Sequence, residues 1–527
     1  MLETQSGFAR EKHLQALAFG IAALGLIWIL TGWILESRSE NLVLSGLGFA
    51  FAVIIVTVLN NWRNGFYLFL FWLVFEDLAR KYLGNNMVIY FAKDVVVGVT
   101  YLAFYSAYRR GQVETFRPQF KVPLALFFWL AVVQVFNPSS PSLLYGLLGM
   151  KIYFYYIPLM FVSYALIRTE KDLQRILVFN MGLAGVIALL GIVQSIVGPT
   201  FLNPQVLAPE LRPLGLLTRM SPISMESVYR PTSVFVSDGR FAWFLIMMWI
   251  VGLGAASYLL LRVRQGRKIV FLGIAVVTTA IVMCGVRAAF LYMVASWFVL
   301  ATAFLWGAPW QWGKAHRLFK ALRNAFILAG LGLFLTVLFF PSAVGARWAF
   351  YMETLSPLSP ESELASRSWD YPIKNVGLAF QHPLWPYGYG TGVASLGVQY
   401  VARFFEEPPP NLGVESGYGT LIVEMGILGL GLWLAWTIAL AASAWRTVRS
   451  LKGSAYFPIA FAVLWYAFLL LFPFTYFSIS AYQNYVLNAY LWILMGVLFR
   501  LPGLLNEAPV AVRPEVARSL ALSQQAI

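Results

Sequence analysis

The chain has 527 residues, of which 60% are hydrophobic and 12% charged, and it carries a formal net charge of +15. Soluble globular proteins contain about 25% charged residues, so this composition excludes the soluble class and indicates a membrane protein. The basic residues are spread along the chain in short clusters and do not form one basic segment with aromatic residues. That distribution argues against a nucleic-acid partner and is the one that membrane topology requires.

Apolar runs of about 20 residues, which as helices cross a hydrocarbon core about 30 Å thick, recur along the whole sequence. We predict an all-α, polytopic membrane helix bundle with about 12–14 transmembrane helices. The chain divides into N-terminal spans within residues 1–149, core spans within 150–340, an extracytoplasmic, partly helical loop at 341–415, C-terminal spans within 416–502 and a cytoplasmic tail at 503–527. The apolar runs are 13–35, 42–60, 65–79, 87–108, 122–136, 150–167, 173–197, 241–261, 269–285, 288–306, 321–340, 416–444, 457–474 and 482–499.

Lysine and arginine are concentrated in alternate loops, for example at Arg109 and Arg110, at residues 262–268 and at residues 446–452. Because basic loops stay in the cytoplasm, this alternation predicts that both termini are cytoplasmic. The loops 198–240 and 341–415 then lie outside. Arg80 and Lys81 are a small exception, since they lie in a loop predicted to be outside.

Two lysines stand out among the apolar runs of the first part of the chain. Lys93 lies about two turns into the run 87–108, beside Asp94, where it would pair with another helix or line the path of a charged donor. Lys151 begins the aromatic stretch KIYFYYIP, whose tyrosines form either an interfacial belt or a platform on which a sugar stacks. We take both lysines as candidate substrate-binding residues.

Three arginines lie near the outer ends of the core spans. The proline-rich loop 198–240 ends in YRPTSVFVSDGR, which contains Arg230 and Arg240, and Arg287 lies between two apolar runs. An arginine in or near hydrocarbon costs several kcal/mol unless it snorkels or finds a partner. Each of the three is therefore either a snorkelling residue at a span end or a binding group for an anion.

Cysteine and histidine are scarce. Cys284 is the only cysteine, and His13, His316 and His382 are far apart in the sequence. This excludes an intrachain disulfide and gives no set of thiol or imidazole ligands for a metal. We expect neither a metal nor another cofactor.

The loop 341–415 contains the stretch SRSWDYPIKNVGLAFQHP, in which four apolar side chains recur at helical spacing: Trp369, Ile373, Val376 and Phe380. This pattern predicts an amphipathic helix at the membrane interface, with Arg367 on it, and the following WPYGYGTG predicts a tight glycine turn. His382 precedes a proline in that turn, so we expect it to have a structural role.

Glu415 lies directly before the apolar run that begins at residue 416. Gly419, Gly426 and Gly429 follow at spacings of seven and three, so they lie near one face of a continuous helix, where a neighbouring backbone can approach closely. Glu424 lies about half a turn out of phase with Glu415 on that helix. We therefore expect Glu424 to bond polar groups inside the bundle and not to form a catalytic pair with Glu415.

The chain resembles the superfamily of bacterial O-antigen ligases and Wzy-type polysaccharide polymerases over roughly residues 150–445. The resemblance rests on an arginine and a tryptophan in an amphipathic helix (Arg367 and Trp369), a glycine turn that begins His-Pro-Leu (382–390), and a membrane helix with Glu-x-Gly-x-x-Gly-Leu (424–430). Segments around Arg230, Arg240 and Arg287 resemble helix junctions of the same family. The resemblance implies a GT-C-like transferase of lipid-linked glycans in the bacterial inner membrane.

Members of this family join glycans outside the cytoplasmic membrane, and their donor is a glycan linked to undecaprenyl pyrophosphate. Arginine suits the departure of pyrophosphate, because its planar and permanently charged fork donates to two phosphate oxygens. The resemblance implies a metal-independent glycosyltransferase, with membrane lipids and other polysaccharide assembly proteins as further partners. We assign catalytic roles to Arg287, Arg230 and Glu415, and substrate binding to Arg240, Arg367, Lys151 and Lys93.

Glu415 and Ser416 stand where O-antigen ligases typically have His-Asn, and that histidine is the family's proposed base or acceptor-positioning group. A carboxylate fills either role, or complements the helix dipole as a first-turn acid. The missing histidine favours a polymerase over an O-antigen ligase that transfers finished glycan to lipid A core. A transporter or flippase of lipid-linked oligosaccharide is the alternative from another class, against which the lack of an internal repeat argues, and the arginines argue against an inactive assembly scaffold.

Overall fold

The computed structural model describes residues 51–507 except 86, 205–216, 263–264, 310–311, 357, 361, 364–365 and 411. Nearly all the regular structure in these residues is helical, and its one sheet is an antiparallel hairpin of β1 (Thr218–Met220) and β2 (Ser227–Tyr229). The predicted span 13–35, most of the span 42–60 and most of the tail lie outside the described residues. The all-α class is confirmed for the part that the structure describes.

Eight helical segments of the described residues are long and apolar enough to cross a membrane. A ninth is reached if the bent pair Ile327–Phe339 and Val344–Leu355 forms one span. The protein is therefore a multi-pass membrane protein. The eight segments are α4 (Met87–Arg109), α6 and α7 together (Leu143–Phe154 and Leu159–Leu166), α8 (Glu170–Val197), α9 (Asp238–Leu261), α11 (Arg287–Gly307), α16 (Gly417–Ser450), α17 to α18 (Phe457–Leu469, then η3 Leu470–Phe474, then Thr475–Phe477) and α20 (Tyr485–Glu507).

Helices also occupy the other predicted spans of the described region, but they are shorter or more charged. α5 (Lys121–Val135) has 15 residues and α10 (Arg267–Met283) has 17, while α3 (Trp62–Tyr82) carries five charged side chains in its 21 residues. α12 (Trp312–Phe339) begins with a basic segment. The difference between eight spans and the predicted 12–14 thus lies in these helices and in the residues before 51.

The chain forms two units, Met1–Phe69 with Asp94–Ser106 and Leu70–Lys93 with Ala107–Ile527. α3 and α4 contribute to both units. In the smaller unit Gly65 permits close helix packing, since a Cβ there would lie 2.5 Å from Val58 Cγ1 and 2.7 Å from Thr100 Oγ1. The candidate site and all that follows belong to the larger unit.

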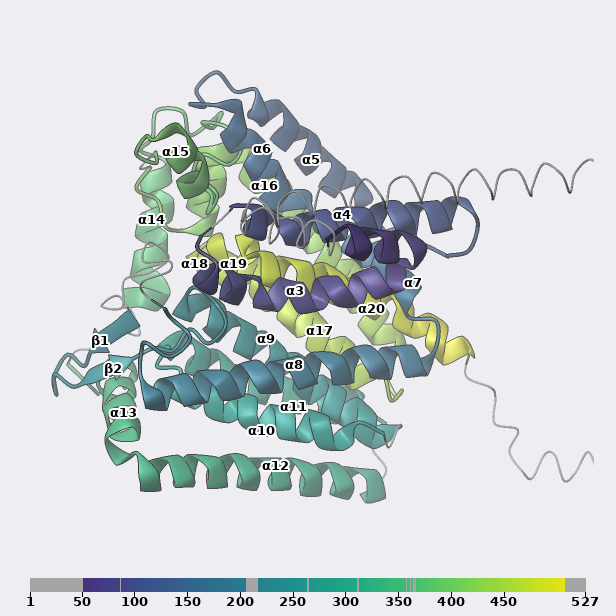
Figure 1. Cartoon of the computed structure of the whole chain (residues 1–527), viewed down its shortest axis with the longest axis vertical. Coiled ribbons are helices and arrows are strands. Elements are labelled where there is room, and N and C mark those ends of the chain that lie inside the picture. Colours follow the sequence, from purple (N-terminus) through teal and green to yellow (C-terminus); the bar gives the residue numbers. More distant parts are fainter. Residues whose placement is uncertain are drawn as a thin grey trace, which may run out of the picture. The chain divides into compact units, whose positions relative to one another are not determined.

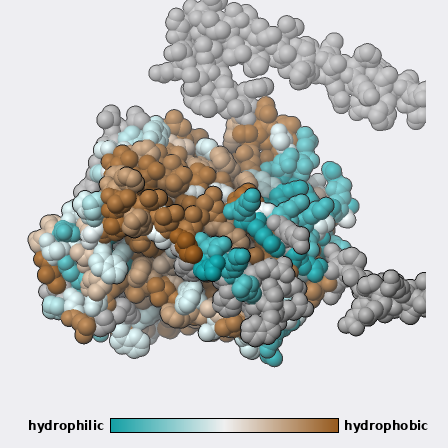
Figure 2. Space-filling model, turned by 90° about the horizontal axis from the view of Figure 1, so that it is seen from below, coloured by the Kyte–Doolittle hydropathy of each residue, from teal (hydrophilic) through white to brown (hydrophobic). Residues whose placement is uncertain are grey.

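α9 is the central helix of the larger unit. In its most apolar stretch 89% of the residues are buried, compared with 33% in α11. Gly254 lets α17 approach α9, because a Cβ at this position would lie 2.6 Å from Ala462 Cβ. Apolar side chains that the protein leaves exposed, such as Trp129 and Phe298, suit contact with lipid. Figure 2 shows a surface with apolar residues over most of its middle and hydrophilic residues gathered toward one side.

The two long loops predicted to lie on one side of the membrane meet at one end of the long helices. β1 and β2 come from the first loop, and the second is largely helical, with α13 (Pro341–Leu355), the π-helical turn η2 (Ser366–Asp370), α14 (Tyr371–Ala379) and α15 (Val398–Phe405). In Figure 1 the hairpin, α13, α14 and α15 lie at the same end of the bundle. α14 confirms the predicted amphipathic helix, and Trp369, Ile373 and Phe380 are exposed along this segment.

The helix that follows Glu415 is not continuous, so the prediction of one glycine-striped helix was wrong in this respect. Gly426 has φ 71° and ψ −176°, which breaks α16. The turn after α14 packs against this break, since a Cβ at Gly426 would lie 2.4 Å from the Pro386 carbonyl oxygen. The turn donates its Tyr389 and Gly390 amides to the carbonyls of Val423 and Glu424, at 2.8 and 3.0 Å. The break thus gives the turn its binding site on α16.

Candidate functional site

Four charged residues lie in one and a half turns at the end of α3, namely Glu76, Asp77, Arg80 and Lys81, and all are buried. The i, i+3 and i, i+4 spacings bring Arg80 Nη1 to 3.2 Å from Asp77 Oδ1 and 3.6 Å from Glu76 Oε1. Lys81 donates to Thr232 Oγ1 at 3.0 Å and to the Ser233 carbonyl at 2.8 Å. Ionisable groups buried in a membrane protein are expensive and mark functional candidates.

Asp77 joins this cluster to the first turn of α9. Arg240 Nη1 lies 2.8 Å from Asp77 Oδ2 and 3.0 Å from Oδ1, and the Val236 amide donates to Oδ2 at 3.2 Å. Ser237 caps α9 by accepting from the Arg240 amide at 3.2 Å, which fixes the backbone that carries the arginine. One buried carboxylate therefore orients two arginines, Arg80 and Arg240.

A cavity of about 370 Å³ opens beside these arginines. Three arginines and three tyrosines line it, and none of its lining residues is an aspartate or glutamate. Asp77 and Glu76 are fully buried and hold the arginines without lining the cavity. The cavity is thus cationic and polar, as suits an anion. Its charged and aromatic lining residues are Arg80, Arg240, Arg403, Tyr90, Tyr400, Tyr485 and Trp243.

The three arginines differ in the donors that they have left for a ligand. Arg80 donates to Asn85 Oδ1, to the Tyr400 hydroxyl at 3.1 Å and to Asp77. Arg240 uses only Nη1, and its Nε and Nη2 have no hydrogen-bond acceptor among the described residues. The exposed Arg403 side chain makes no ion pair within the described part of the chain. Arg240 and Arg403 therefore have N–H donors available for a ligand. Arg80 instead uses its donors to bind Asn85, Tyr400 and Asp77, which line or support the cavity.

Lys93 and Lys151 lie behind an aromatic wall of the cavity and are not among its lining residues. Lys93 Nζ lies 3.5 Å from Glu76 Oε2 and 3.7 Å from the ring centroid of Tyr90. Lys151 Nζ lies 4.3 Å from the same centroid, and Tyr90 stacks on Tyr400 at 4.9 Å. The two lysines thus support the tyrosines by cation–π contacts. Direct substrate contact by either lysine stays a prediction.

Arg230 and Arg287 do not line this cavity. Arg230 Nη1 pairs with Asp238 Oδ2 at 2.9 Å, and Arg287 Nη2 pairs with Glu363 Oε2 at 2.9 Å. Burial raises the pKa of the neighbouring Tyr229, whose phenol stays neutral. The side chain of Arg367 lies outside the described atoms, although its backbone forms part of η2. Of the arginines assigned from the sequence, the structure brings Arg240 to the cavity.

Glu415 lines a second cavity, of about 530 Å³, together with Tyr371, Lys374 and Asn375. The Tyr371 hydroxyl donates to Glu415 Oε2, and the Glu415 amide donates to Asn375 Oδ1 at 3.1 Å. These bonds fix Glu415 against α14. Neither cavity shares a lining residue with the other, so Glu415 and Arg240 face different spaces.

His382 and Glu424, for which the sequence predicted structural roles, both lie near the glycine turn that follows α14. His382 Nε2 lies 2.8 Å from the Leu412 carbonyl, which ties the glycine turn to the chain before Glu415. Glu424 is fully buried and bonds Tyr153 and Ser395, so the expectation that it bonds polar groups inside the bundle is confirmed. No group of three or more histidine, cysteine, aspartate or glutamate side chains in the described residues is arranged to hold a metal ion. Metal-independent chemistry stays a prediction.

Neither Arg80 nor Arg403 was predicted from the sequence as a site residue. The available signal was the stretch EDLARK at the end of an apolar run, since an acid three or four residues before an arginine forms a pair on one helix face. For Arg403 the signal was weak, because it is a single charge on the short helix α15.

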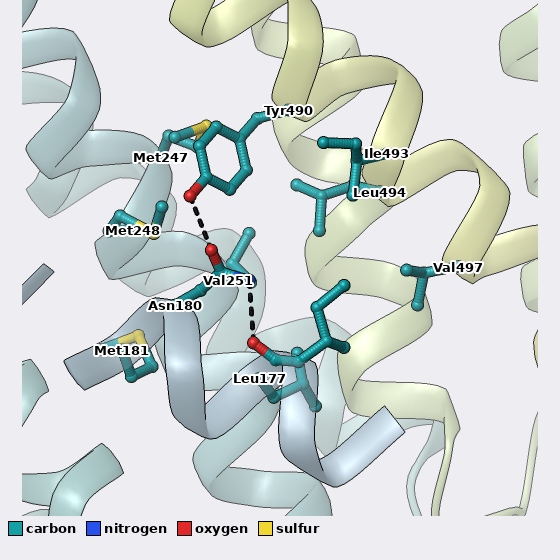
Figure 3. Close-up of a pocket in the computed structure, with 11 residues that line it drawn as sticks. Leu177, Asn180, Met181, Met247, Met248, Val251, Tyr490, Ile493, Leu494 and Val497 are labelled. Carbon is teal, nitrogen blue, oxygen red and sulfur yellow. Dashed lines mark hydrogen bonds between the residues drawn. The ribbon is translucent and has the colours of Figure 1, made fainter. Parts of the chain in front are cut away.

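A third cavity, between α8, α9 and α20, is too small for a substrate. The Tyr490 hydroxyl donates to Asn180 Oδ1 at 2.6 Å. Figure 3 shows this pair among apolar residues. The volume of about 20 Å³ holds about one water molecule. We therefore assign no substrate-binding or catalytic role to this cavity.

These observations define a class: a multi-pass membrane protein, all-α in its described part, with a buried charged cluster, one cavity lined by three arginines and a second cavity lined by Glu415 and Lys374. In the comparisons with known proteins, no family model and no curated protein matches the sequence.

Proposed function

We propose that the chain is a bacterial cell-surface polysaccharide polymerase, which joins undecaprenyl-pyrophosphate-linked glycan units on the extracytoplasmic side of the inner membrane. The observation that carries the proposal is the 370 Å³ cavity, into which Arg240 and Arg403 present donors that no carboxylate of the lining occupies. The resemblance of residues 150–445 to polymerases and O-antigen ligases supports the same reaction. The basic loops at the other ends of the spans favour an extracytoplasmic cavity.

In this proposal the pyrophosphate of the lipid-linked donor occupies the 370 Å³ cavity. The oxygen of an acceptor hydroxyl attacks the anomeric carbon of the donor sugar, and the bond from that carbon to the pyrophosphate oxygen breaks. The electron pair leaves with the pyrophosphate, and Arg240 and Arg403 stabilise the charge that develops there. Because Asp77 holds Arg240 in place before the substrate arrives, little reorganisation is needed in the transition state.

The acceptor glycan occupies the 530 Å³ cavity, where Glu415 and Lys374 offer polar groups. The proton of the acceptor hydroxyl passes to Glu415 or, with Glu415 only positioning the acceptor, to water. The hydrogen bond from Tyr371 favours positioning, since it holds the Glu415 side chain in one orientation against α14.

The catalytic role predicted from the sequence for Arg230 and Arg287 stays a prediction, since neither arginine lines the cavity proposed for the pyrophosphate. Arg230 pairs with Asp238, which is two residues before Arg240 in the chain, so it also supports the turn that carries Arg240. The replacement Arg287→Ala tests the direct role, because normal consumption of the lipid-linked donor by the folded variant would exclude it.

The decisive experiment compares Arg240→Ala with Arg262→Ala in purified, membrane-reconstituted protein. Arg240 lies in the first turn of α9, whereas Arg262 is the residue directly after its last turn and pairs with Glu170 at 3.0 Å. Removing one preorganised donor to a developing anion lowers turnover by roughly 10²–10³-fold, so Arg240→Ala should consume the donor that much more slowly. Arg262→Ala should behave as the unaltered protein. Equal turnover in both variants would refute the proposal.

The acceptor separates a polymerase from an O-antigen ligase. A strain that lacks the gene should lose a polymer while keeping intact lipopolysaccharide if the protein is a polymerase. Finished polymer that accumulates on its lipid carrier would instead identify a ligase. A flippase is distinguished by the donor itself, because transport leaves the bond between sugar and pyrophosphate intact.

A further inference from the structure

Residues 394–396, here called the partition, lie between the two cavities. Ala394 lines the 530 Å³ cavity, whereas Leu396 and the following Gly397 line the 370 Å³ cavity. At most about 7 Å separates the Cα atoms of Ala394 and Leu396, since this is the span of two residues of fully extended chain. Any movement of the partition therefore changes both cavities together.

Two buried side chains hold the partition. Glu424 Oε1 accepts from the Ala394 amide at 3.0 Å and from Ser395 Oγ at 2.7 Å, and Gln483 Oε1 accepts from the Leu396 amide at 2.9 Å. Glu424 is fully buried in α16, and Gln483 is buried at the end of α19 (Ser480–Gln483). Every residue of the partition is thus hydrogen-bonded to a side chain of α16 or α19.

The hydrogen-bond donors in this network can be assigned from the chain of contacts. The Leu396 amide must donate, so the oxygen of the Gln483 amide faces it and the nitrogen faces the hydroxyls of Tyr153 and Ser395, at 3.2 and 2.9 Å. Both hydroxyls accept from that nitrogen and so direct their own protons to Glu424. Glu424 is therefore the acceptor for three donors, the Tyr153 and Ser395 hydroxyls and the Ala394 amide.

We propose that Glu424 is a positioning residue that, through the partition, sets the distance between the donor pyrophosphate in one cavity and the acceptor glycan in the other. This inference rests on the proposed function. Glu424 touches neither substrate, since it lines neither cavity. It acts by holding Ala394 and Ser395 while Gln483 holds Leu396, so that the acceptor oxygen reaches the anomeric carbon only when the partition is in place.

The test is Glu424→Gln in the full-length protein, with Glu407→Gln as the matched control. A glutamine must keep its oxygen toward the Ala394 amide, so its nitrogen faces the Tyr153 hydroxyl, whose proton then loses its acceptor. Glu407 is exposed on the same side of the bundle and makes no side-chain bond to described residues. Amide hydrogen exchange in a peptide that covers the partition should be about tenfold faster in Glu424→Gln and unchanged in Glu407→Gln.

Two further measurements separate positioning from general damage to the fold. Titration with undecaprenyl pyrophosphate should give an affinity for Glu424→Gln within about twofold of the unaltered protein, while turnover at saturating donor falls by about tenfold or more. A structural role alone would lower affinity and turnover together. Turnover that stays normal while the partition exchanges faster would overturn the positioning role.

Ser395→Ala provides a second variant if Glu424→Gln does not fold. It removes one bond to Glu424 and one to Gln483 but leaves the carboxylate in place. The same faster exchange and lower turnover are expected, and unchanged exchange in both variants would overturn the inference. The proposed function fails separately, if Arg240→Ala consumes the lipid-linked donor at the normal rate.

Discussion

Asp77 accepts two hydrogen bonds from Arg240 Nη1, at 3.0 and 2.8 Å, although 163 residues separate the two in the chain. The same carboxylate lies 3.2 Å from Arg80 Nη1. Two of the three arginines of the cavity therefore depend on one buried acid, which is not itself among the lining residues of the cavity. The first prediction concerns the loss of this acid.

Asp77→Ala should lower the free energy of unfolding by about 3–5 kcal/mol, because it leaves buried guanidinium groups without their counter-charge. Chemical denaturation in mixed micelles measures the change. Arg262→Ala is the matched control, since it breaks a partly exposed pair with Glu170 and should change the free energy by about 1 kcal/mol or less. Equal effects in the two variants would contradict the structural role of Asp77.

Arg403→Ala should weaken the binding of undecaprenyl pyrophosphate by roughly 10–100-fold, which corresponds to a lost charge-assisted hydrogen bond. Arg403 is exposed and makes no ion pair with described residues, so the thermal unfolding midpoint should not change. Isothermal titration calorimetry measures the affinity. Binding that stays as tight as in the unaltered protein would remove Arg403 from the proposed donor site.

Gly426→Ala should destabilise the protein by at least about 1 kcal/mol, because a side chain is strained at φ 71° and its Cβ would lie 2.4 Å from the Pro386 carbonyl oxygen. The glycine turn should lose protection from hydrogen exchange. Gly431→Ala, in the same helix and with open space around its Cβ, should be neutral or stabilising by up to about 1 kcal/mol. A neutral Gly426→Ala would mean that the break in α16 does not constrain the turn.

Glu415→Gln distinguishes the two roles proposed for Glu415. We expect the variant to keep turnover within about tenfold of normal, because an amide still positions an acceptor hydroxyl, whereas loss of a general base lowers turnover by about 10²–10⁴-fold. Turnover is measured at saturating lipid-linked donor. A loss as large as that of Glu415→Ala would assign Glu415 as the base.

The sequence was sufficient to predict the helical class, the position of most spans in the described region, the helix α14 and the turn after it. These features follow from local patterns in the sequence: the length of apolar runs predicts the spans, the helical spacing of apolar residues predicts α14, and closely spaced glycines predict the turn. The sequence also predicted that Glu424 lies inside the bundle. It could not place Asp77 beside Arg240, since a contact between distant segments depends on how helices pack and not on spacing along the chain.

The break at Gly426 was missed for a related reason. Glycine in an apolar run is compatible with both a helix and a positive φ, and the choice here is made by the turn 386–390, which takes the carbonyls of Val423 and Glu424 as acceptors. Tertiary contacts thus decided the local conformation. The same holds for Arg403, whose importance comes from the cavity that α15 borders.

The shared carboxylate of Asp77 also bears on how the chain enters the membrane. α3 carries two acids and two bases at its end, and its insertion alone would leave Asp77 with Arg80 as its nearest cation. Arg240 is synthesised 163 residues later. The end of α3 can therefore reach its final depth and partners only after α9 has been made, which couples the insertion of an early helix to the completion of the core.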